Sequence, residues 1–335
     1  MFRSFLAVLA TLGVILFAGW LALKREDIPY EQLEAIYANA DSRYLQFGDD
    51  MRVHFRDVGP RGAPAIVLVH GFSASLHTWE PWVNNLKQDY RVITLDLPGH
   101  GLSRCIDNSE IGPGQFAATI NRVANTLKIE WFTLAGNSMG GSAAWNYALT
   151  HPERLDGLVL VDAAGWPRIE EEGESRSLIF RLLEIDIARR VMKELDLSSL
   201  IRGGLENSFG DPSFVTDEMV ERYANLARAP CHRAALLQLV SGQGERTEAT
   251  PELLAGIKTP TLVMHGELDN LIPSVHGEQF AAAIPGAKLL LYPGVGHLPQ
   301  EEIAELSAGD LRAFLSTEVY GVRDEALQAI TSPAP

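Results

Sequence analysis

The chain carries the sequence GNSMGG at residues 136–141, between an apolar stretch at 131–135 and a stretch of small residues at 142–150. This pattern predicts a buried strand that turns into a helix within a few residues, and glycines beside the turn relieve the backbone crowding there. The turn places the side chain of Ser138 at the carboxyl end of the strand, which is the G-x-S-x-G context of a nucleophilic serine. Because the following helix begins with unpaired N–H groups, the Met139 N–H is expected to stabilise an oxyanion. The simpler alternative is a serine that only caps an ordinary turn.

A serine hydroxyl becomes a nucleophile when a base lies beside it, and the base needs an acid that orients it. His297 lies in a loop just after the last expected strand, and Asp269 follows the strand before that one. Both side chains should therefore stand at the carboxyl edge of the sheet, as Ser138 does. The order Ser, Asp, His along the chain is one in which such triads occur. Asp162, which follows an earlier strand, is the alternative acid.

The sequence HGF at residues 70–72 follows the apolar stretch 65–69. Gly71 allows close approach of the backbone, and the Phe72 N–H can supply the second oxyanion donor. We expect Gly71 and Phe72 to contact the substrate as well, although a plain turn glycine would leave the same pattern. This chemistry requires neither a metal nor an organic cofactor. We therefore expect a catalytic site with no metal and no cofactor.

Short, mostly apolar stretches have the composition of strands that are buried on both faces. Helical stretches lie between most of them, for example at 115–127, and this alternation indicates a doubly wound, mostly parallel α/β sheet. Alternating apolar and polar residues at 43–47 and 51–56 predict an antiparallel hairpin ahead of it. The expected buried strands are residues 65–69, 91–95, 131–135, 158–161, 261–264 and 288–292.

Between residues 161 and 261 helical patterns replace strands. An insertion of helices between two strands of one sheet is most simply a cap over the strand ends, where ligands of open α/β sheets bind. The apolar face at 178–187 would then line a pocket for an acyl chain as well as pack within the cap. The expected units are a core at 43–165 and 251–320, a cap at 166–250, a linker or stalk at 26–42 and a tail at 321–335.

Residues 5–23 are 19 consecutive residues without a charge, with basic residues on both sides. About 20 apolar residues cross a bilayer as a helix. A cleaved signal peptide has a shorter apolar region and a small-x-small cleavage site, and here Trp20 and two basic residues occupy that position. Residues 1–25 are therefore predicted to form a single-pass membrane anchor, with a signal peptide as the alternative. Positive charges at both ends leave the orientation open, and the extracytoplasmic side is preferred for the catalytic domain.

The chain has 335 residues, with 28 Lys and Arg against 43 Asp and Glu, and a formal net charge of -15. Such a surface is repelled by phosphate backbones, which excludes binding to nucleic acid. The 46% of hydrophobic residues are typical of a globular protein. The two cysteines, Cys105 and Cys231, are too few for a disulfide scaffold or a cysteine zinc site, and their pairing stays open.

These motifs together resemble the α/β-hydrolase superfamily over residues 43–315. Within it, GNSMGG at 136–141 followed by LVDAAG at 160–165 is similar to small bacterial lipases and esterases and to membrane-anchored monoacylglycerol lipases. The same GNSMGG occurs in C–C bond hydrolases of aromatic ring degradation, but those usually carry SGPG where this chain has FSAS at 72–75. Haloalkane dehalogenases and epoxide hydrolases of this fold use an aspartate nucleophile. Residue 138 is serine, which argues against both activities.

The resemblance implies a hydrolase of carboxylic esters with apolar acyl chains, which acts through a Ser-His-Asp triad and an acyl-enzyme. The expected substrate is a small-molecule ester or a lipid-like compound. C–C hydrolysis of ring-fission products is the alternative, and cofactor-free haloperoxidases share the triad. A non-catalytic binding protein that keeps the fold is a further alternative, although a binder does not need a nucleophile, a base, an acid and oxyanion glycines together.

Overall fold

The computed structural model describes residues 11, 14, 18–47, 51–104, 111–167, 191–241 and 247–321. Its centre is one eight-stranded sheet with the strand order β1-β2-β4-β3-β5-β6-β7-β8. The strands are β1 (Ser42–Phe47), β2 (Met51–Val58), β3 (Ala65–Val69), β4 (Arg91–Leu95), β5 (Phe132–Asn137), β6 (Leu155–Val161), β7 (Thr261–Gly266) and β8 (Lys288–Tyr292). Strands β3 to β8 run parallel, whereas β1 and β2 form an antiparallel hairpin that joins the sheet through β4. The predicted mixed, mostly parallel sheet is confirmed.

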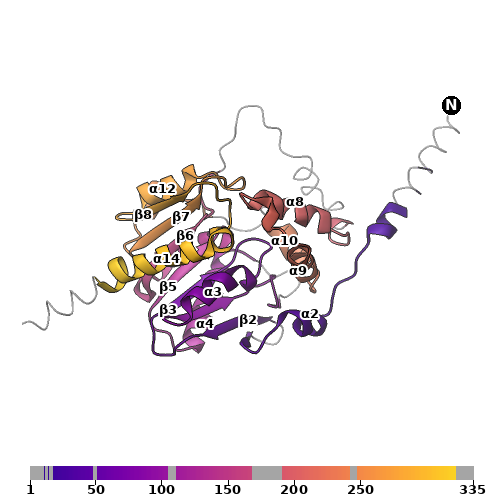
Figure 1. The fold of residues 1–335 in the computed structure, drawn as a ribbon. Coiled ribbons are helices and arrows are strands. Elements are labelled where there is room, and N and C mark those ends of the chain that lie inside the picture. Colours follow the sequence, from indigo (N-terminus) through magenta and orange to yellow (C-terminus); the bar gives the residue numbers. More distant parts are fainter. Residues whose placement is uncertain are drawn as a thin grey trace, which may run out of the picture.

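Helices cover both faces of this sheet (Figure 1). The elements outside the cap are η1 (Leu76–Trp79), α3 (Glu80–Leu86), α4 (Pro113–Thr126), α5 (Met139–Thr150), η2 (Pro152–Arg154), α11 (Pro251–Leu254), α12 (Val275–Ala283), α13 (Pro299–Glu302), α14 (Ala304–Phe314) and η4 (Leu315–Gly321). Successive side chains of one strand enter opposite apolar layers. Val67 and Val69 of β3 lie in the cluster of α4 and α5, and Ile66 and Leu68 lie in that of α3 and α14. The strands are apolar on both faces because both faces are covered.

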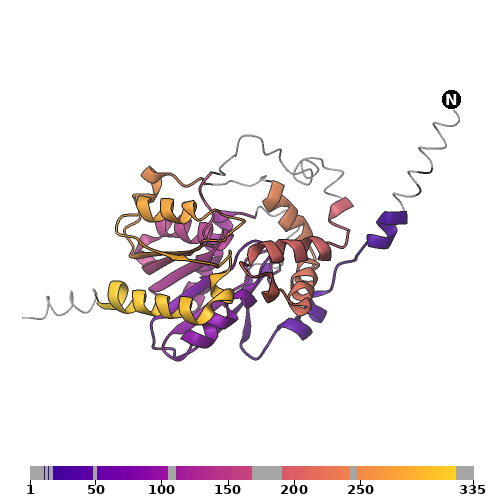
Figure 2. The same ribbon diagram turned by 45° about the horizontal axis from the view of Figure 1, so that its top comes forward.

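A helical unit lies between β6 and β7 in the chain and beside the sheet in space (Figures 1 and 2). It contains α8 (Ser198–Ser208), η3 (Pro212–Phe214), α9 (Asp217–Ala227) and α10 (His232–Ser241). Leu205 of α8 packs against Val220 and Tyr223 of α9 in a small apolar cluster of their own. These helices occupy the region predicted as a cap. The apolar face predicted at 178–187 lies outside the described residues.

Helix α2 (Tyr30–Tyr37) occupies the region predicted as a linker or stalk. The side chain of Leu33, in this helix, is fully buried in an apolar cluster that includes Leu226 of α9. The hydroxyl of Tyr30 lies 3.0 Å from Nε2 of His232 in α10. Residues of the expected linker therefore pack as part of the folded body, between the sheet and the cap.

The segment that precedes α2 runs along the cap (Figure 1). Lys24 forms an antiparallel β-bridge with Leu195, which lies just before α8. A little further on, Asp27 pairs with Arg233 of α10 over 2.6 Å. The chain is therefore fastened to the cap before it reaches the sheet.

Most of the anchor predicted at residues 1–25 lies outside the described residues, which include only residues 11, 14 and 18–25 of it. In the part of the chain that the structure describes, no helix combines the length and the apolar character that crossing a membrane requires. The predicted tail also falls outside the described residues, apart from its first residue.

Leu33→Ala should destabilise the folded protein by about 2–5 kcal/mol, because the substitution leaves a cavity at a fully buried position. Ile36→Ala is the matched control on the same helix, since Ile36 is 63% exposed. The control should cost no more than about 0.5 kcal/mol. Denaturant unfolding followed by circular dichroism measures both. Equal, small losses in the two variants would mean that α2 is only a loosely attached linker.

Candidate active site

Ser138 stands at the turn from β5 to α5, where its φ of 56° and ψ of -117° place the backbone in a strained region that few residues adopt. Glycines on both sides make the turn possible. A Cβ atom at Gly140 would lie 2.2 Å from the carbonyl oxygen of Val69, and one at Gly136 would lie 2.1 Å from the carbonyl oxygen of Gly140. No side chain fits at either position. The turn leaves Ser138 partly exposed at the carboxyl end of β5.

His297 and Asp269 form a buried pair at the same edge of the sheet. The Nδ1 atom of His297 lies 2.6 Å from Oδ2 of Asp269, whose other oxygen accepts the N–H groups of Leu271 and Ile272. Burial by itself would raise the pKa of Asp269, but the neighbouring His297 and the hydrogen bonds lower it well below its usual range. Burial by itself would lower the pKa of His297, but the negative charge and the hydrogen bond of Asp269 outweigh burial, and the pKa is raised. An ionised acid bonded to an imidazole is the arrangement that can orient a general base.

Asn137 connects the loop of His297 to the elbow. Its side-chain amide donates to the carbonyl oxygen of His297 over 3.0 Å and to that of Val161 over 3.2 Å. Among the hydrogen bonds of the described residues, none joins the Ser138 hydroxyl to His297. Such catalytic bonds are often long in unliganded enzymes and shorten when substrate binds. Through Asn137, the structure brings Ser138, His297 and Asp269 to one edge of the sheet.

Gly71 lies directly against the elbow. A Cβ atom at this position would stand 3.1 Å from the Cβ atom of Ser138, so a side chain there would press on the serine. Phe72 follows Gly71 in this loop, and Met139 is the first residue of α5, where a helix leaves its N–H without an intrahelical partner. The two predicted oxyanion residues therefore belong to segments that meet at Ser138.

His70 holds the loop of Gly71 in place. The N–H of Leu97 donates to Nε2 of His70 over 3.0 Å, so the ring proton is on Nδ1. Nδ1 in turn donates to the carbonyl oxygen of Gly71 over 2.7 Å. Burial lowers the pKa of His70, which keeps the ring neutral and this bonding pattern intact at neutral pH.

Glu302 joins the cap to the loop of His297. Its Oε2 atom accepts the N–H of Gly210, just after α8, and its Oε1 atom accepts the N–H of Gly296, at 2.9 and 2.8 Å. The N–H of His297 itself donates to the carbonyl oxygen of Ser208, the last residue of α8, over 2.7 Å. The cap therefore helps to hold the base in position.

Asp162, the alternative acid, lies beside the pair but does not make its hydrogen bond. Its Oδ1 atom accepts the N–H of Gly266 over 2.9 Å. Single atoms of Asp162, Asp269 and His297 all lie within 4.8 Å of one another. The structure thus gives Asp269 the bond to the imidazole and places a second buried carboxylate next to it.

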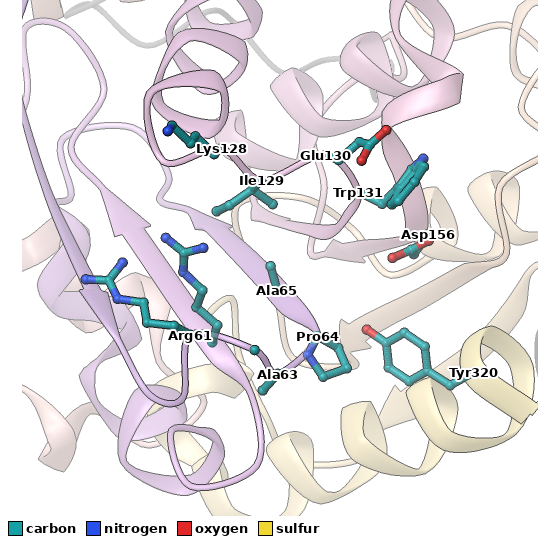
Figure 3. A pocket seen from close by; sticks show the side chains of 12 residues that line it. Arg61, Ala63, Pro64, Ala65, Lys128, Ile129, Glu130, Trp131, Asp156 and Tyr320 are labelled. Atoms are coloured by element: carbon teal, nitrogen blue, oxygen red, sulfur yellow. The ribbon is translucent and has the colours of Figure 1, made fainter.

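A surface cavity of about 320 Å³ opens at the other end of the sheet (Figure 3). Ala65 and Arg91, the first residues of β3 and β4, line it together with Arg61. Asp57 accepts hydrogen bonds from both arginines, so one carboxylate offsets one of their two positive charges. This cavity lies at the amino ends of the strands, whereas ligands of open α/β sheets bind at the carboxyl ends. We therefore place the candidate active site at the edge of Ser138.

Sequence analysis did not identify Asn137, His70 or Glu302 as parts of this site. Asn137 and His70 lie inside the motifs GNSMGG and HGF, directly before Ser138 and Gly71. This adjacency could have marked them as parts of the site. Glu302 offers no such signal, because its two partners come from the cap and from another loop.

A mostly parallel sheet covered by helices, a serine at a strand-to-helix turn and a buried Asp–His pair at the carboxyl edge define the class of α/β hydrolases. The chain belongs to the alpha/beta hydrolase fold family, whose model matches residues 64–303.

Named relatives fall into more than one kind of hydrolase. The chain is 31% identical to a 2-hydroxy-6-oxononadienedioate/2-hydroxy-6-oxononatrienedioate hydrolase of Comamonas testosteroni, over 76% of this chain and 88% of the relative. A thermophilic esterase from Thermogutta terrifontis is similar in structure, with a TM-score of 0.68 and 26% identity, over 84% of this chain and 100% of the esterase. A bacterial membrane phospholipase A shares the fold, with a TM-score of 0.70 and 22% identity, over 95% of this chain and 99% of the phospholipase.

Gly140→Ala should lose several kcal/mol of stability or fail to fold, because the new methyl group would overlap the backbone carbonyls of Val69 and His70. Gly309→Ala in α14 is the control, since nothing lies within 4 Å of a Cβ atom there. The control should be neutral or gain up to about 1 kcal/mol from helix propensity. Thermal unfolding measures both, and a Gly140→Ala variant as stable as the wild type would contradict the crowding at the elbow.

Glu302→Gln should lower kcat/KM for a soluble ester roughly 10-fold or more, because an amide can accept only one of the two N–H groups and opposes the other. Glu305→Gln, at an exposed position of α14, is the matched control and should keep wild-type activity. Steady-state hydrolysis of p-nitrophenyl butyrate measures both. Unchanged kinetics in Glu302→Gln would show that the two bonds of Glu302 do not position His297 for catalysis.

Proposed function

We propose that the protein is a serine hydrolase of carboxylic esters with apolar acyl chains. The observation that carries the proposal is the 2.6 Å contact of Asp269 with His297, whose loop is held against the Ser138 elbow by Asn137. An imidazole oriented by a buried, ionised acid, next to a serine on a strained turn, is what activation of a hydroxyl requires.

In the proposed mechanism, Nε2 of His297 takes the proton of Ser138 as the serine oxygen attacks the ester carbonyl. Asp269 keeps the other ring proton on Nδ1 and stabilises the imidazolium. The N–H groups of Phe72 and Met139 bind the oxyanion. The ester C–O bond then breaks, and the alcohol leaves with the proton from His297. Water, activated by the same imidazole, attacks the acyl-enzyme and releases the carboxylic acid.

Apolar side chains at the site support an apolar acyl group. Leu268 and Leu271, which lie on either side of Asp269 in the chain, are 50% and 46% exposed. Phe72, in the expected oxyanion loop, is 40% exposed. Exposed apolar side chains so near in the chain to residues of the proposed site favour a ligand with apolar parts.

C–C hydrolysis of ring-fission products is the second candidate, because relatives at 31% and 30% identity carry names of that activity. The sequence FSAS at 72–75, in place of the SGPG usual in those enzymes, favours ester hydrolysis. Turnover of p-nitrophenyl esters compared with that of 2-hydroxy-6-oxo-6-phenylhexa-2,4-dienoate separates the two. Faster turnover of the dienoate would replace ester hydrolysis by the second candidate.

We also propose that residues 5–23 anchor the protein in a membrane, with the catalytic domain on the extracytoplasmic side. The uncharged length of this stretch supports the anchor. Cys231 is disulfide-bonded, and Cys105, the other cysteine of the chain, lies outside the described residues. Because disulfides persist in oxidising compartments, this bond supports the extracytoplasmic side. Recovery of the full chain in the soluble fraction after cell lysis would contradict the anchor.

Ser138→Ala should lower the turnover of p-nitrophenyl butyrate by a factor of order 10⁴ or more, since the nucleophile is lost. A fluorophosphonate probe should label the wild type at Ser138 and leave this variant unlabelled. Ser142→Ala, one turn further along α5, is the matched control and should keep both activity and labelling. Near-wild-type turnover in Ser138→Ala would end the proposal, and a folded wild type that is never labelled would favour a non-catalytic binding protein.

A further inference from the structure

A second pair of ionisable side chains, Asp162 and His265, is buried beside Asp269 and His297. Asp162 follows β6 and His265 belongs to β7, and neither side chain is exposed. Nε2 of His265 lies 3.6 Å from Oδ1 of Asp162 and 3.5 Å from Oδ2 of Asp269. The two pairs therefore form one cluster around the carboxylate that orients the base.

Each member of the second pair has a polar atom without a partner. Oδ2 of Asp162 is buried with no hydrogen bond among the described residues. Nε2 of His265 faces the carbonyl oxygen of Ile272 at 2.9 Å, so this nitrogen carries a proton. Nδ1 of His265 has no partner among the described residues and is covered by α12, where a Cβ atom at Gly277 would lie 2.8 Å from it. Such atoms are costly to bury, and a functional role is one reason for a protein to keep them.

The second pair holds one proton in common. Two carboxylates as close as those of Asp162 and Asp269 cannot both ionise unless a positive charge lies between them. Burial raises the pKa of Asp162 to about 7, and the nearby His265 and His297 offset only part of this effect. Burial by itself would lower the pKa of His265, but Asp269 and Asp162 together raise it. At neutral pH the pair is therefore neutral overall, with the proton on the carboxylate or on the imidazole.

Two other ionisable groups of the described residues face the cluster from neighbouring elements, and both stay uncharged near neutral pH. His276 of α12 acts on His265, and burial lowers the pKa of His276. Tyr292 of β8 acts on Asp162, and burial together with Asp310 raises the pKa of Tyr292. Near neutral pH, a change of protonation in the cluster therefore occurs on its own aspartates and histidines.

We propose that Asp162 and His265 are positioning residues that control how readily His297 takes the proton of Ser138. The inference rests on the function proposed above. While the second pair is neutral, Asp269 alone supplies the negative charge that stabilises the imidazolium. A negative charge on Asp162 would add to that stabilisation, and a positive charge on His265 would oppose it. The two residues thus act on the base through its electrostatic surroundings and do not touch the substrate.

A substitution of Asp162 and a substitution of His265 should shift the pKa of His297 in opposite directions. Asp162→Asn leaves His265 as the only member of the pair that can hold the proton, and a positive charge there lowers the pKa of His297. The acid limb of the rate therefore moves to lower pH by about one unit. Asparagine tolerates the positive φ of 44° at this position. His265→Gln leaves Asp162 without the imidazole that shares its proton, and a negative charge there raises the pKa of His297, so the same limb moves to higher pH. The double variant has a neutral pair, as the wild type does, and its midpoint should return towards the wild-type value.

The rate constant of Ser138 labelling by a fluorophosphonate, measured on the full chain across the range in which histidine titrates, reports the base without knowledge of the natural substrate. Asp310→Asn is the control, because this carboxylate binds the hydroxyl of Tyr292 over 2.8 Å and has no place in the cluster. The control should keep the wild-type midpoint. Thermal unfolding establishes that each variant is folded.

Opposite shifts in the two single variants, with near cancellation in the double variant, support the inference. Shifts of the same sign, or wild-type midpoints in folded variants, overturn it. If Asp162→Asn does not fold, His265→Gln decides by itself, since an unchanged or lowered midpoint contradicts the proposed role. Failure of the wild type to be labelled at Ser138 is a different result, which overturns the proposed function instead.

Discussion

The close packing of backbone at the turn before α5 is the constraint on which the proposed active site depends. β5 ends, reverses direction at Ser138 and becomes a helix where Gly136 and Gly140 leave no space for a side chain. Gly71 faces the same turn from the next strand, so three backbone segments meet at the serine. Once this turn is fixed, the remaining groups need only arrive on loops from the carboxyl ends of parallel strands, and the order of the sheet brings them there.

The sheet and the positions of Ser138, Asp269 and His297 could be predicted because their signals are local. Each strand is a short apolar run, and each candidate residue follows such a run directly. The bonds that support the site could not be predicted in this way. Asn137 reaches a partner 160 positions away and Glu302 reaches one 92 positions away, and an amide or a carboxylate that bonds to backbone leaves no pattern in the sequence. The polar composition of residues 26–42 predicts a linker or stalk, whereas the burial of Leu33 depends on a cap helix far along the chain.

Ester hydrolysis and C–C hydrolysis in this family differ in the group that leaves, while the nucleophile and the base can be the same. This explains why a chain can be 31% identical to a C–C hydrolase and 26% identical to an esterase of very similar fold. The difference must lie where the leaving group is held. In this chain the cap is bonded to the loop of His297 through Glu302. A change in the cap can therefore alter the placement of His297.

The route of the chain before α2 has a mechanical consequence. Tension on the amino-terminal end would act first on the short bridge between Lys24 and Leu195 and on the ion pair of Asp27 with Arg233, all of which end in the cap. Once these contacts open, the load would pass along the chain to α2, where Glu34 pairs with Arg52 of β2. Pulling on the beginning of the chain would thus detach the amino-terminal segment from the cap while the long strand pairs of the sheet stayed whole.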